Sequence, residues 1–284
     1  MGLDLSILYR GVLSGCNYDC GYCPFAKRVD DKATLQKDAQ DLDRFVNWVK
    51  SRSGDSLRIL FTPWGEALIR KYYQSALCEL SHLPQIKAVS IQTNLSCSLS
   101  WAKNLNPKTA SLWCTYHPDQ VTLDKFLQQC QKLDMLEILY SVGCVGKHEL
   151  MDDIEILRKE LSDDIYVWVN AFKDNGADYY QNSHIEFLEH IDPLFRANLN
   201  NYTSLGQACR AGYQSISVDG KGDVRRCHFI SDVIGNIYET QLESILKPRL
   251  CTRDICDCHI GYSNIAELDL DRHYKGNWAL GRVR

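Results

Sequence analysis

Cys16-Asn17-Tyr18-Asp19-Cys20-Gly21-Tyr22-Cys23, followed by Pro24 and Phe25, is the stretch that decides how the rest of the chain is interpreted. Its three cysteines form a C-x3-C-x2-C loop directly after the apolar run Leu5–Tyr9, which we predict to be the first strand. Thiolates are soft ligands that suit zinc or iron–sulfur clusters. Structural zinc sites have four ligands, and neither a histidine nor a fourth cysteine follows within fifty residues. Three thiolates around a four-iron cluster would leave one iron open to another ligand.

The overall composition fits one sizeable globular domain with a small appendage. The chain has 284 residues, of which 45% are hydrophobic and 24% charged. A net charge of −4 argues against a general nucleic-acid or membrane-surface binder. The N-terminal residues do not resemble a signal peptide, and no apolar run is long enough to span a bilayer. We therefore expect a cytoplasmic protein without a nucleic-acid or membrane partner.

Thirteen cysteines are many for a chain of this length. Because the number is odd and there is no secretion signal, a disulfide framework is a poor explanation. Reduced cysteines, several of them holding metal clusters, fit better. Five cysteines stand alone in segments with helix or strand patterns, and we interpret them as small buried hydrophobic residues. These five are Cys78, Cys97, Cys114, Cys130 and Cys144.

Strand and helix patterns alternate along the first two-thirds of the chain. The predicted strands are 5–9, 57–61, 86–92, 111–115, 136–142 and 165–171. The predicted helices are 34–52, 67–83, 98–105, 122–133, 149–161 and 177–191. Six such units predict a parallel sheet with right-handed crossovers. Because a closed barrel needs eight units, the expected fold is α/β, a partial (β/α)6 TIM-like barrel.

The pattern changes near residue 200. Residues 215–218 and 223–226 read as two strands around the Gly-rich turn 219–222, which predicts a β-hairpin. A short helix over 242–246 and a Cys-rich piece follow. We therefore predict a barrel domain over residues 1–197 and a small C-terminal cluster-binding extension over residues 198–284.

The loop at residues 16–23 resembles the cluster motif of the radical S-adenosylmethionine (SAM) superfamily. That motif is C-x3-C-x-aromatic-C, and Tyr22 stands at its aromatic position. The resemblance implies that Cys16, Cys20 and Cys23 hold a [4Fe-4S] cluster and that Tyr22 lies beside SAM. Members of the superfamily have the partial barrel fold predicted above.

Further candidate residues follow the second strand, because parallel α/β folds bind ligands at the carboxyl ends of their strands. Trp64-Gly65-Glu66-Ala67 resembles the Gly-Gly-Glu-Pro motif that holds the SAM amino group in this superfamily, although Trp64 and Ala67 depart from it. Exposed backbone at Gly65 and the Glu66 carboxylate would receive an ammonium group. The alternative is a turn followed by an acid that favours a helix N-terminus.

The later strand ends carry the remaining expected SAM contacts. Thr93 and Asn94 follow the third strand, where the resemblance implies contact with the methionine part of SAM; Asn94 is equally consistent with a helix cap. His117, after the fourth strand, would contact SAM or substrate, or serve as a structural imidazole. Gly143 would end the fifth strand and let the backbone approach the adenosine, and Asn170 would end the sixth, facing the adenine.

A second group of cysteines lies in the C-terminal extension. Cys209, Gly222 and Cys227 form C-x12-G-x4-C, which resembles the start of the SPASM and twitch modules that hold auxiliary iron–sulfur clusters. The intervening hairpin would bring the two thiols together. A full SPASM module has seven cysteines and only five are present, so the twitch form with one auxiliary cluster fits better. We expect Cys256 and Cys258 to complete the ligand set, with Cys251 as the alternative. A zinc ribbon of Cys209, Cys227, Cys256 and Cys258, or with His259, is the competing interpretation.

The resemblance implies an enzyme that reductively cleaves SAM to a 5′-deoxyadenosyl radical, which removes a hydrogen atom from a substrate. Two [4Fe-4S] clusters and SAM are the expected cofactors, with an electron donor such as flavodoxin or ferredoxin as partner. The auxiliary cluster would transfer electrons or bind substrate. The expected reaction is the oxidative modification of a peptide or a small molecule. The alternative is a non-catalytic iron–sulfur or zinc-stabilised protein.

Overall fold

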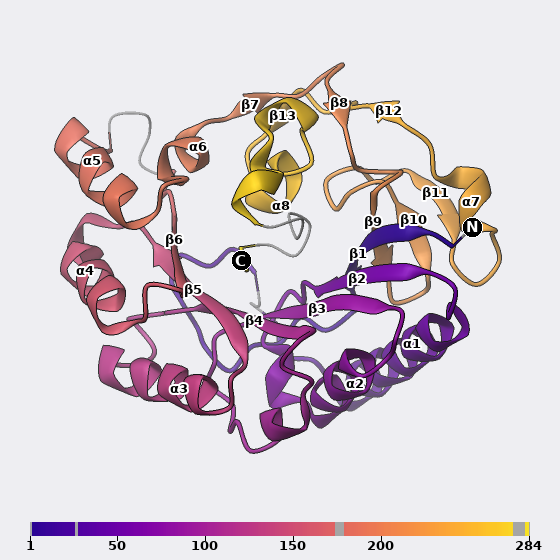
Figure 1. The fold of residues 1–284 in the computed structure, drawn as a ribbon, viewed down its shortest axis with the longest axis horizontal. Helices are drawn as coiled ribbons and strands as arrows, with labels where there is room; N and C mark the ends of the chain where they lie inside the picture. Colours follow the sequence, from indigo (N-terminus) through magenta and orange to yellow (C-terminus); the bar gives the residue numbers. More distant parts are fainter. Residues whose placement is uncertain (1, 26–27, 174–178, 275–281, 284) are drawn as a thin grey trace.

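Six parallel strands form the centre of the fold. The computed structural model describes residues 2–25, 28–173, 179–274 and 282–283. Its parallel strands are β1 (Asp4–Arg10), β2 (Ser56–Phe61), β3 (Ile86–Thr93), β4 (Ala110–Thr115), β5 (Leu139–Val145) and β6 (Tyr166–Asn170). They lie side by side in chain order and curve into an open arc (Figure 1). This confirms the predicted α/β fold with a partial TIM-like barrel.

Helices cover the convex side of the arc (Figure 1). They are α1 (Lys32–Ser51), α2 (Lys71–Ser81), α3 (Leu123–Met135), α4 (Met151–Glu160), α5 (Asn182–Ile191) and α6 (Phe195–Leu199), with short 3-10 turns η1 (Ala67–Ile69), η2 (Ala102–Asn104) and η3 (His148–Leu150). In α1, the Asp31 side chain caps the N-terminus by accepting from the Thr34 N–H. Leu42, Phe45 and Val49 then point into the main core at helical spacing.

Several element boundaries differ from the sequence-based prediction. The segment predicted as one helix over 67–83 is interrupted at Arg70, whose backbone is extended. Only the turn η2 forms in the segment predicted as a helix over 98–105. Strand β5 begins at Leu139 instead of residue 136, because α3 continues to Met135 and Glu137 adopts φ +54° in the turn that follows. Helix α5 begins at Asn182, and the predicted start at Ala177 lies outside the described residues.

The C-terminal segment extends the same sheet. Strand β9 (Ser215–Asp219) runs parallel to β1, with Ser6 opposite Ser215. Strands β10 (Asp223–Arg225) and β11 (Val233–Asn236) continue it antiparallel, so the sheet has nine strands in the order β11-β10-β9-β1-β2-β3-β4-β5-β6. Gly222 has φ +89° in the turn between β9 and β10, a conformation that favours glycine. The predicted hairpin is therefore present, and the division between residues 197 and 198 stays a prediction.

The rest of the C-terminal segment consists of short elements. Two two-stranded sheets pair β8 (Ala208–Cys209) with β12 (Arg249–Leu250) and β7 (Tyr202–Thr203) with β13 (Ile255–Cys256). Helical pieces are α7 (Leu242–Ile245), α8 (His259–Tyr262), η4 (Ala266–Leu268) and η5 (Leu270–His273). None of the described helices combines the length and apolar composition needed to cross a bilayer.

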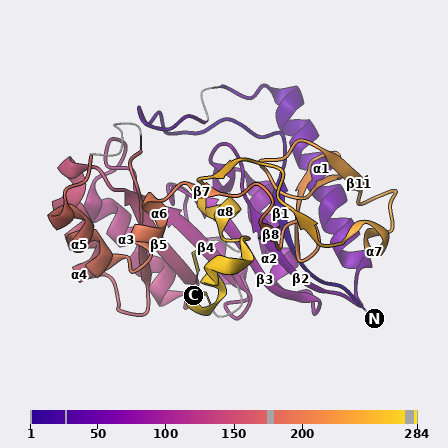
Figure 2. The same cartoon turned by 90° about the horizontal axis from the view of Figure 1, so that it is seen from above.

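The concave face of the sheet is covered by C-terminal residues. Side chains alternate along a strand, so Ile7 and Ile59 face the helices while Leu8 and Leu60 face the inside of the arc. The inward-facing side chains form a second apolar cluster with residues such as Tyr262 of α8. Figure 1 shows α8 in yellow within the opening of the arc, and Figure 2 shows the chain after β1 running past the strand ends. What remains open is a cavity at the carboxyl ends of the strands.

Candidate functional site: a cysteine-lined cavity at the strand ends

One cavity of about 690 Å³ brings together most of the residues predicted from the sequence. It is enclosed by the loop after β1, the ends of β2 to β6 and the C-terminal segment. The predicted residues in its wall are Cys16, Cys20, Tyr22, Cys23, Gly65, Glu66, Thr93, Asn94, His117, Asn170 and Cys258. Its volume is in the range of sites that enclose small molecules.

The cysteine loop is anchored before its first cysteine. The Asp30 carboxylate accepts hydrogen bonds from the backbone N–H groups of Ser14 (3.1 Å) and Gly15 (2.6 Å). Within the loop, the N–H of Cys23 donates to the carbonyl of Cys20 at 3.1 Å, closing a tight turn. Cys20 is buried, whereas Cys16 and Cys23 are half-buried. The backbone therefore holds three thiols of one loop against one cavity.

Two of these thiols, Cys16 and Cys20, are protonated near neutral pH in the absence of a metal. Burial raises the pKa of Cys16, and burial raises the pKa of Cys20 to about 11 despite a hydrogen bond from Tyr22. Metal ligation requires thiolates, so binding a cluster here would release protons. Among the described residues no three His, Cys, Asp or Glu side chains converge closely enough for one metal ion. A four-iron cluster spaces its thiolates more widely than a single ion does, and the three soft donors fit such a cluster.

The turn that contains Gly65 packs on the cysteine loop. A Cβ atom at Gly65 would lie 2.0 Å from the carbonyl oxygen of Gly15, so only glycine allows this approach. The N–H of Glu66 donates to the same oxygen at 3.2 Å. Gly65 therefore fixes the distance between the end of β2 and the cysteines.

Glu66 joins the ends of β2 and β3. Its buried carboxylate accepts from the Leu68 N–H at 2.9 Å, the Thr93 hydroxyl at 2.9 Å and the Asn94 N–H at 2.6 Å. Burial raises its pKa to about 7, although these hydrogen bonds oppose the shift. The bond to Leu68 makes Glu66 the cap of η1, as the alternative interpretation expected. Its predicted contact with the SAM ammonium group stays a prediction.

Asn94 connects β3 with the cysteine loop. Its Nδ2 lies 3.1 Å from Asn17 Oδ1 and 3.7 Å from Cys16 Sγ, and its Oδ1 accepts from the Ser96 N–H at 3.0 Å. Thr93 is turned the other way, towards Glu66. Both residues are nearly fully buried. Asn94 is thus placed to orient the first cysteine of the loop.

His117 faces the other end of the loop. Its Nδ1 lies 2.7 Å from the Tyr22 hydroxyl and 3.4 Å from Cys20 Sγ. Burial lowers its pKa to about 4, so the imidazole is neutral near pH 7. The Tyr22 ring stacks on the imidazole with centroids 5.9 Å apart. Asn170, at the end of β6, lines the cavity on the same side as Trp168 and Phe172.

Gly143 does not occupy the predicted position. It lies inside β5, which continues to Val145, so the expectation that Gly143 ends the strand is wrong. A Cβ atom there would lie 2.0 Å from Trp168 Cδ2 and 2.3 Å from the Trp168 carbonyl oxygen. The glycine is needed because the neighbouring indole packs over it, and the cavity wall on this strand is formed by Val145.

The other four cysteines of the C-terminal segment lie near enough to Cys256 to act on its pKa. Cys209 lies in the β8–β12 ladder and Cys256 in the β7–β13 ladder. Burial raises the pKa of Cys227, with Cys209 and Cys251 adding to the shift, and burial raises the pKa of Cys256 to about 12, with all the other cysteines of this segment adding to it. Cys258 instead lines the cavity, and Arg10 lies close enough to act against the burial that raises its pKa. Cys251 acts on the pKa of Cys209, Cys227 and Cys256, and Cys258 acts on that of Cys256; which of the two is the fourth thiol, and ligation itself, stays a prediction.

Residues that the sequence-based prediction did not include also line the cavity. They are chiefly Arg10, Trp113, Trp168, Lys173, Asn198, His228 and Phe229, and His259, which was named only as a possible zinc ligand, also lines it. Arg10 is the last residue of the first strand, next to the cysteine loop. It could have been predicted as a site residue, because a charged residue at a strand end is also the pattern that indicated Glu66. The contribution of His228 and His259 depends on how the C-terminal segment folds over the barrel, for which the sequence carries no local signal.

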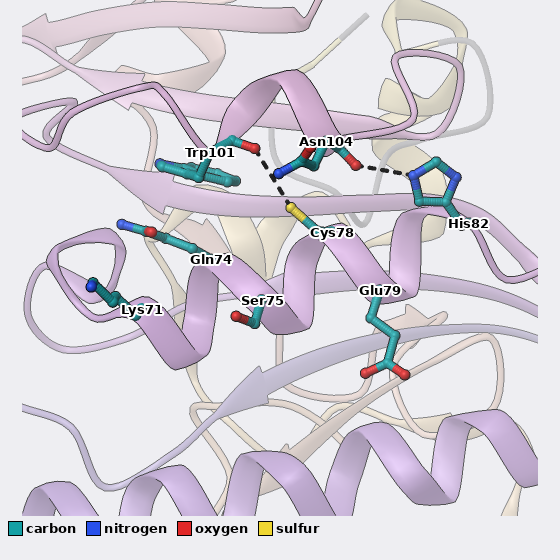
Figure 3. Close-up of a pocket in the computed structure, with 8 residues that line it drawn as sticks. All are labelled: Lys71, Gln74, Ser75, Cys78, Glu79, His82, Trp101 and Asn104. Atoms are coloured by element: carbon teal, nitrogen blue, oxygen red, sulfur yellow. Dashed lines mark hydrogen bonds between the residues drawn. The ribbon is translucent and has the colours of Figure 1, made fainter.

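The remaining single cysteines lie away from this cavity. Cys97, Cys114, Cys130 and Cys144 are buried, and Cys78 is half-buried with its Sγ 3.9 Å from the Trp101 carbonyl oxygen. Cys78 lines an open hollow of about 480 Å³ between α2 and η2 on the outer side (Figure 3). Apart from Cys78, none of the cysteines or predicted site residues lines this hollow, and its His82 is bonded to the Asn104 carbonyl oxygen at 3.0 Å (Figure 3).

Comparison with known proteins gives structural matches only. No family model matches the chain, and no curated protein matches it either. The structure of Streptococcus suis SuiB bound to S-adenosylmethionine is similar at a TM-score of 0.56 and 16% identity, covering 86% of this chain and 66% of SuiB. The structure of anSMEcpe with bound AdoMet and Cp18Cys peptide is similar at a TM-score of 0.55 and 17% identity, covering 86% of this chain and 80% of that one. The chain thus spans just under two-thirds of the length of SuiB. It has the fold of the radical SAM enzymes, as the cysteine motif at residues 16–23 predicts.

Proposed function

We propose that this protein is a radical SAM enzyme. The observation that carries the proposal is the placement of Cys16, Cys20 and Cys23 in the wall of one cavity at the strand ends. When bound there, a [4Fe-4S] cluster would supply the electron that cleaves SAM to methionine and a 5′-deoxyadenosyl radical, which takes a hydrogen atom from the substrate. The fold shared with SuiB and anSMEcpe, whose structures both hold bound SAM, supports this assignment.

The residues around the cysteines would position the cofactors. The Gly65–Glu66 turn and Asn94 contact the cysteine loop from the ends of β2 and β3. His117 contacts Tyr22 of this loop from the end of β4. Glu66, Thr93 and Asn94 would form the side that receives the methionine end of SAM. Asn170 would lie towards the adenosine end, and Val145 forms the cavity wall on β5 in place of the predicted Gly143. The aromatic wall formed by Trp113 and Trp168 would exclude water from a radical formed beside it.

We also propose an auxiliary cluster in the C-terminal segment. The proximity of Cys209, Cys227, Cys251 and Cys256 supports a set of four thiolates, which would be coordinatively complete. A complete cluster transfers electrons and does not bind substrate directly. Such a cluster suits an oxidation whose electron leaves through it.

The substrate we propose is a peptide or a small molecule that is oxidised. The similar anSMEcpe structure holds a bound peptide, which supports the first of these classes. A flavodoxin or ferredoxin in the cytoplasm would supply the reducing electron. Cytoplasmic conditions would keep the thirteen cysteines reduced, and the described ones form no disulfides.

The proposal is tested by metal content and by the response of the first cluster to SAM. After anaerobic reconstitution we expect about eight irons and about eight sulfides per chain. The reduced protein should show an electron paramagnetic resonance signal that changes when SAM is added. Cys23→Ala, which lacks one ligand of the first cluster, should lack this signal. One zinc per chain, with no iron–sulfur signal that responds to SAM, would instead establish the alternative of a zinc-stabilised protein.

A further inference from the structure

The cavity contains a cation that no acidic side chain of the described residues neutralises. Arg10 is the last residue of β1, six positions before Cys16, and its side chain lines the cavity. Its Nε donates to the Thr62 carbonyl oxygen at 2.6 Å, and its Cζ lies 3.9 Å from the centre of the Trp64 ring. These two contacts fix the plane of the guanidinium. Among the described residues, no hydrogen bond uses its two terminal nitrogens and no ion pair includes it.

The carboxylates of the cavity wall are occupied elsewhere. Glu66 accepts from Leu68, Thr93 and Asn94. Asp257 lies beside Lys173, whose Nζ donates to the Asp257 carbonyl oxygen at 3.3 Å and to the Asn200 carbonyl oxygen at 3.1 Å. Cys258 also lines the cavity near Arg10, and among the described residues no hydrogen bond or ion pair joins these two side chains.

An enclosed guanidinium without a counter-ion is unfavourable unless a ligand supplies one. Burial lowers the pKa of Arg10 to about 10, which still leaves it charged at neutral pH. A half-buried cation loses hydration, and an anion that bonds to it recovers that loss. Guanidinium presents two parallel N–H groups that match the two oxygens of a carboxylate. Arg10 therefore has the charge, the free donors and the fixed plane of a carboxylate-binding group.

The anchoring of Arg10 reaches into the C-terminal segment. Thr62, whose carbonyl oxygen holds the guanidinium, has its hydroxyl 2.8 Å from His228 Nε2, and the other imidazole nitrogen of His228 is bonded to the Ser217 hydroxyl. This series of hydrogen bonds places Arg10 on the side of the cavity that faces the C-terminal cysteines. The residues proposed to receive SAM, including Thr93 and Asn94, lie at the end of β3.

We propose that Arg10 binds a carboxylate of the substrate, so that the enzyme acts on acidic molecules or on peptides with a carboxylate near the reacting position. This inference rests on the function proposed above and narrows its substrate class. The aromatic side chains of Trp64, Trp113 and Phe229, which also line the cavity, would receive the apolar part of such a molecule.

The test compares two probes that differ only in charge, N-acetylphenylalanine and its carboxamide. Their dissociation constants are measured by ligand-observed NMR on the reconstituted protein, with and without SAM. Hydrogen bonds to a charged group contribute about 1.5–3 kcal/mol, so the acid should bind at least about tenfold more tightly than the amide. Arg10→Gln should reduce this ratio to about twofold or less, and Arg10→Lys should keep part of it because the charge remains. Arg196→Gln, which removes a cation paired with Glu189 on the exposed side of α6, should keep the full ratio.

Three results would overturn the inference. Equal binding of acid and amide to the wild-type protein would show that the cavity does not select a carboxylate. An undiminished ratio in Arg10→Gln would assign the selection to another residue. A loss of SAM affinity in Arg10→Gln at least as large as the loss for the acid would assign Arg10 to the SAM carboxylate. The thermal midpoint of each variant checks its folding. The ratio of acid binding to amide binding is measured without SAM, so it does not depend on whether the protein cleaves SAM. A failure of this inference can therefore be distinguished from a failure of the proposed function.

Discussion

Replacing Gly65 by alanine tests whether close packing of the β2 turn positions the cysteine loop. The added Cβ would lie 2.0 Å from the oxygen and 2.4 Å from the carbon of the Gly15 carbonyl, and 2.9 Å from the Ser14 oxygen. All three are backbone atoms, so no side chain can rotate away and the loop must move by about 1 Å to restore ordinary contact. Overpacking of this kind costs about 1–3 kcal/mol, and the backbone clash puts Gly65→Ala at the upper end.

Gly21→Ala is the matched control, because Gly21 belongs to the same loop and its added Cβ would meet nothing within 4 Å. Thermal unfolding of the two variants, followed by circular dichroism, should show a midpoint lowered by about 6 °C or more for Gly65→Ala. Gly21→Ala should change stability by less than about 0.5 kcal/mol. After reconstitution, Gly65→Ala should also retain less iron than Gly21→Ala. Equal midpoints and equal iron contents for the two variants would refute the role given to Gly65.

Three further predictions concern the auxiliary cysteines, Glu66 and Gly143. Cys251→Ala should lower the iron content from about eight to about four per chain, and Cys258→Ala should leave it unchanged; the reverse order, measured by iron analysis, would restore Cys258 as the ligand. The folded pKa of Glu66, about 7, lies above its ordinary value, so its contribution to stability is present at low pH and is lost as pH rises towards 7. We therefore expect the free energy of unfolding of Glu66→Gln, relative to that of wild type, to rise by up to about 3 kcal/mol from pH 5 to pH 8, as measured by urea unfolding. Parallel pH profiles of the two proteins would contradict the assigned shift. Gly143→Ala should destabilise the protein by about 1–3 kcal/mol, because its Cβ would meet Trp168, and an unchanged urea midpoint would show that β6 gives way easily.

Local patterns were sufficient to predict the barrel. Strands such as β2 and helices such as α1 have periodicities that arise from burying one face, and that face is visible in the sequence. The strand ends then follow from the fold, which is why Glu66, Thr93 and Asn94 were expected at one cavity. The start of β5 was misplaced because Leu136 and Ile138 look like strand residues, whereas they follow the end of α3 around a turn with positive φ at Glu137.

Long-range pairing could not be predicted in this way. Strand β9 joins the sheet beside β1 although more than two hundred residues separate them, and no local pattern specifies that partner. Cys256 and Cys258 look equivalent in the sequence, and only the β7–β13 pairing and helix α8 give them different surroundings.

Formation of 5′-deoxyadenosine tests the central claim most directly. The reconstituted protein is reduced with dithionite in the presence of SAM, and the product is measured by liquid chromatography with mass spectrometry. We predict that wild type produces 5′-deoxyadenosine and methionine and that Cys16→Ala, Cys20→Ala and Cys23→Ala do not, while Cys251→Ala still produces them because its first cluster is intact. A wild-type protein that holds its full iron content, yet leaves SAM intact after reduction, would contradict the claim.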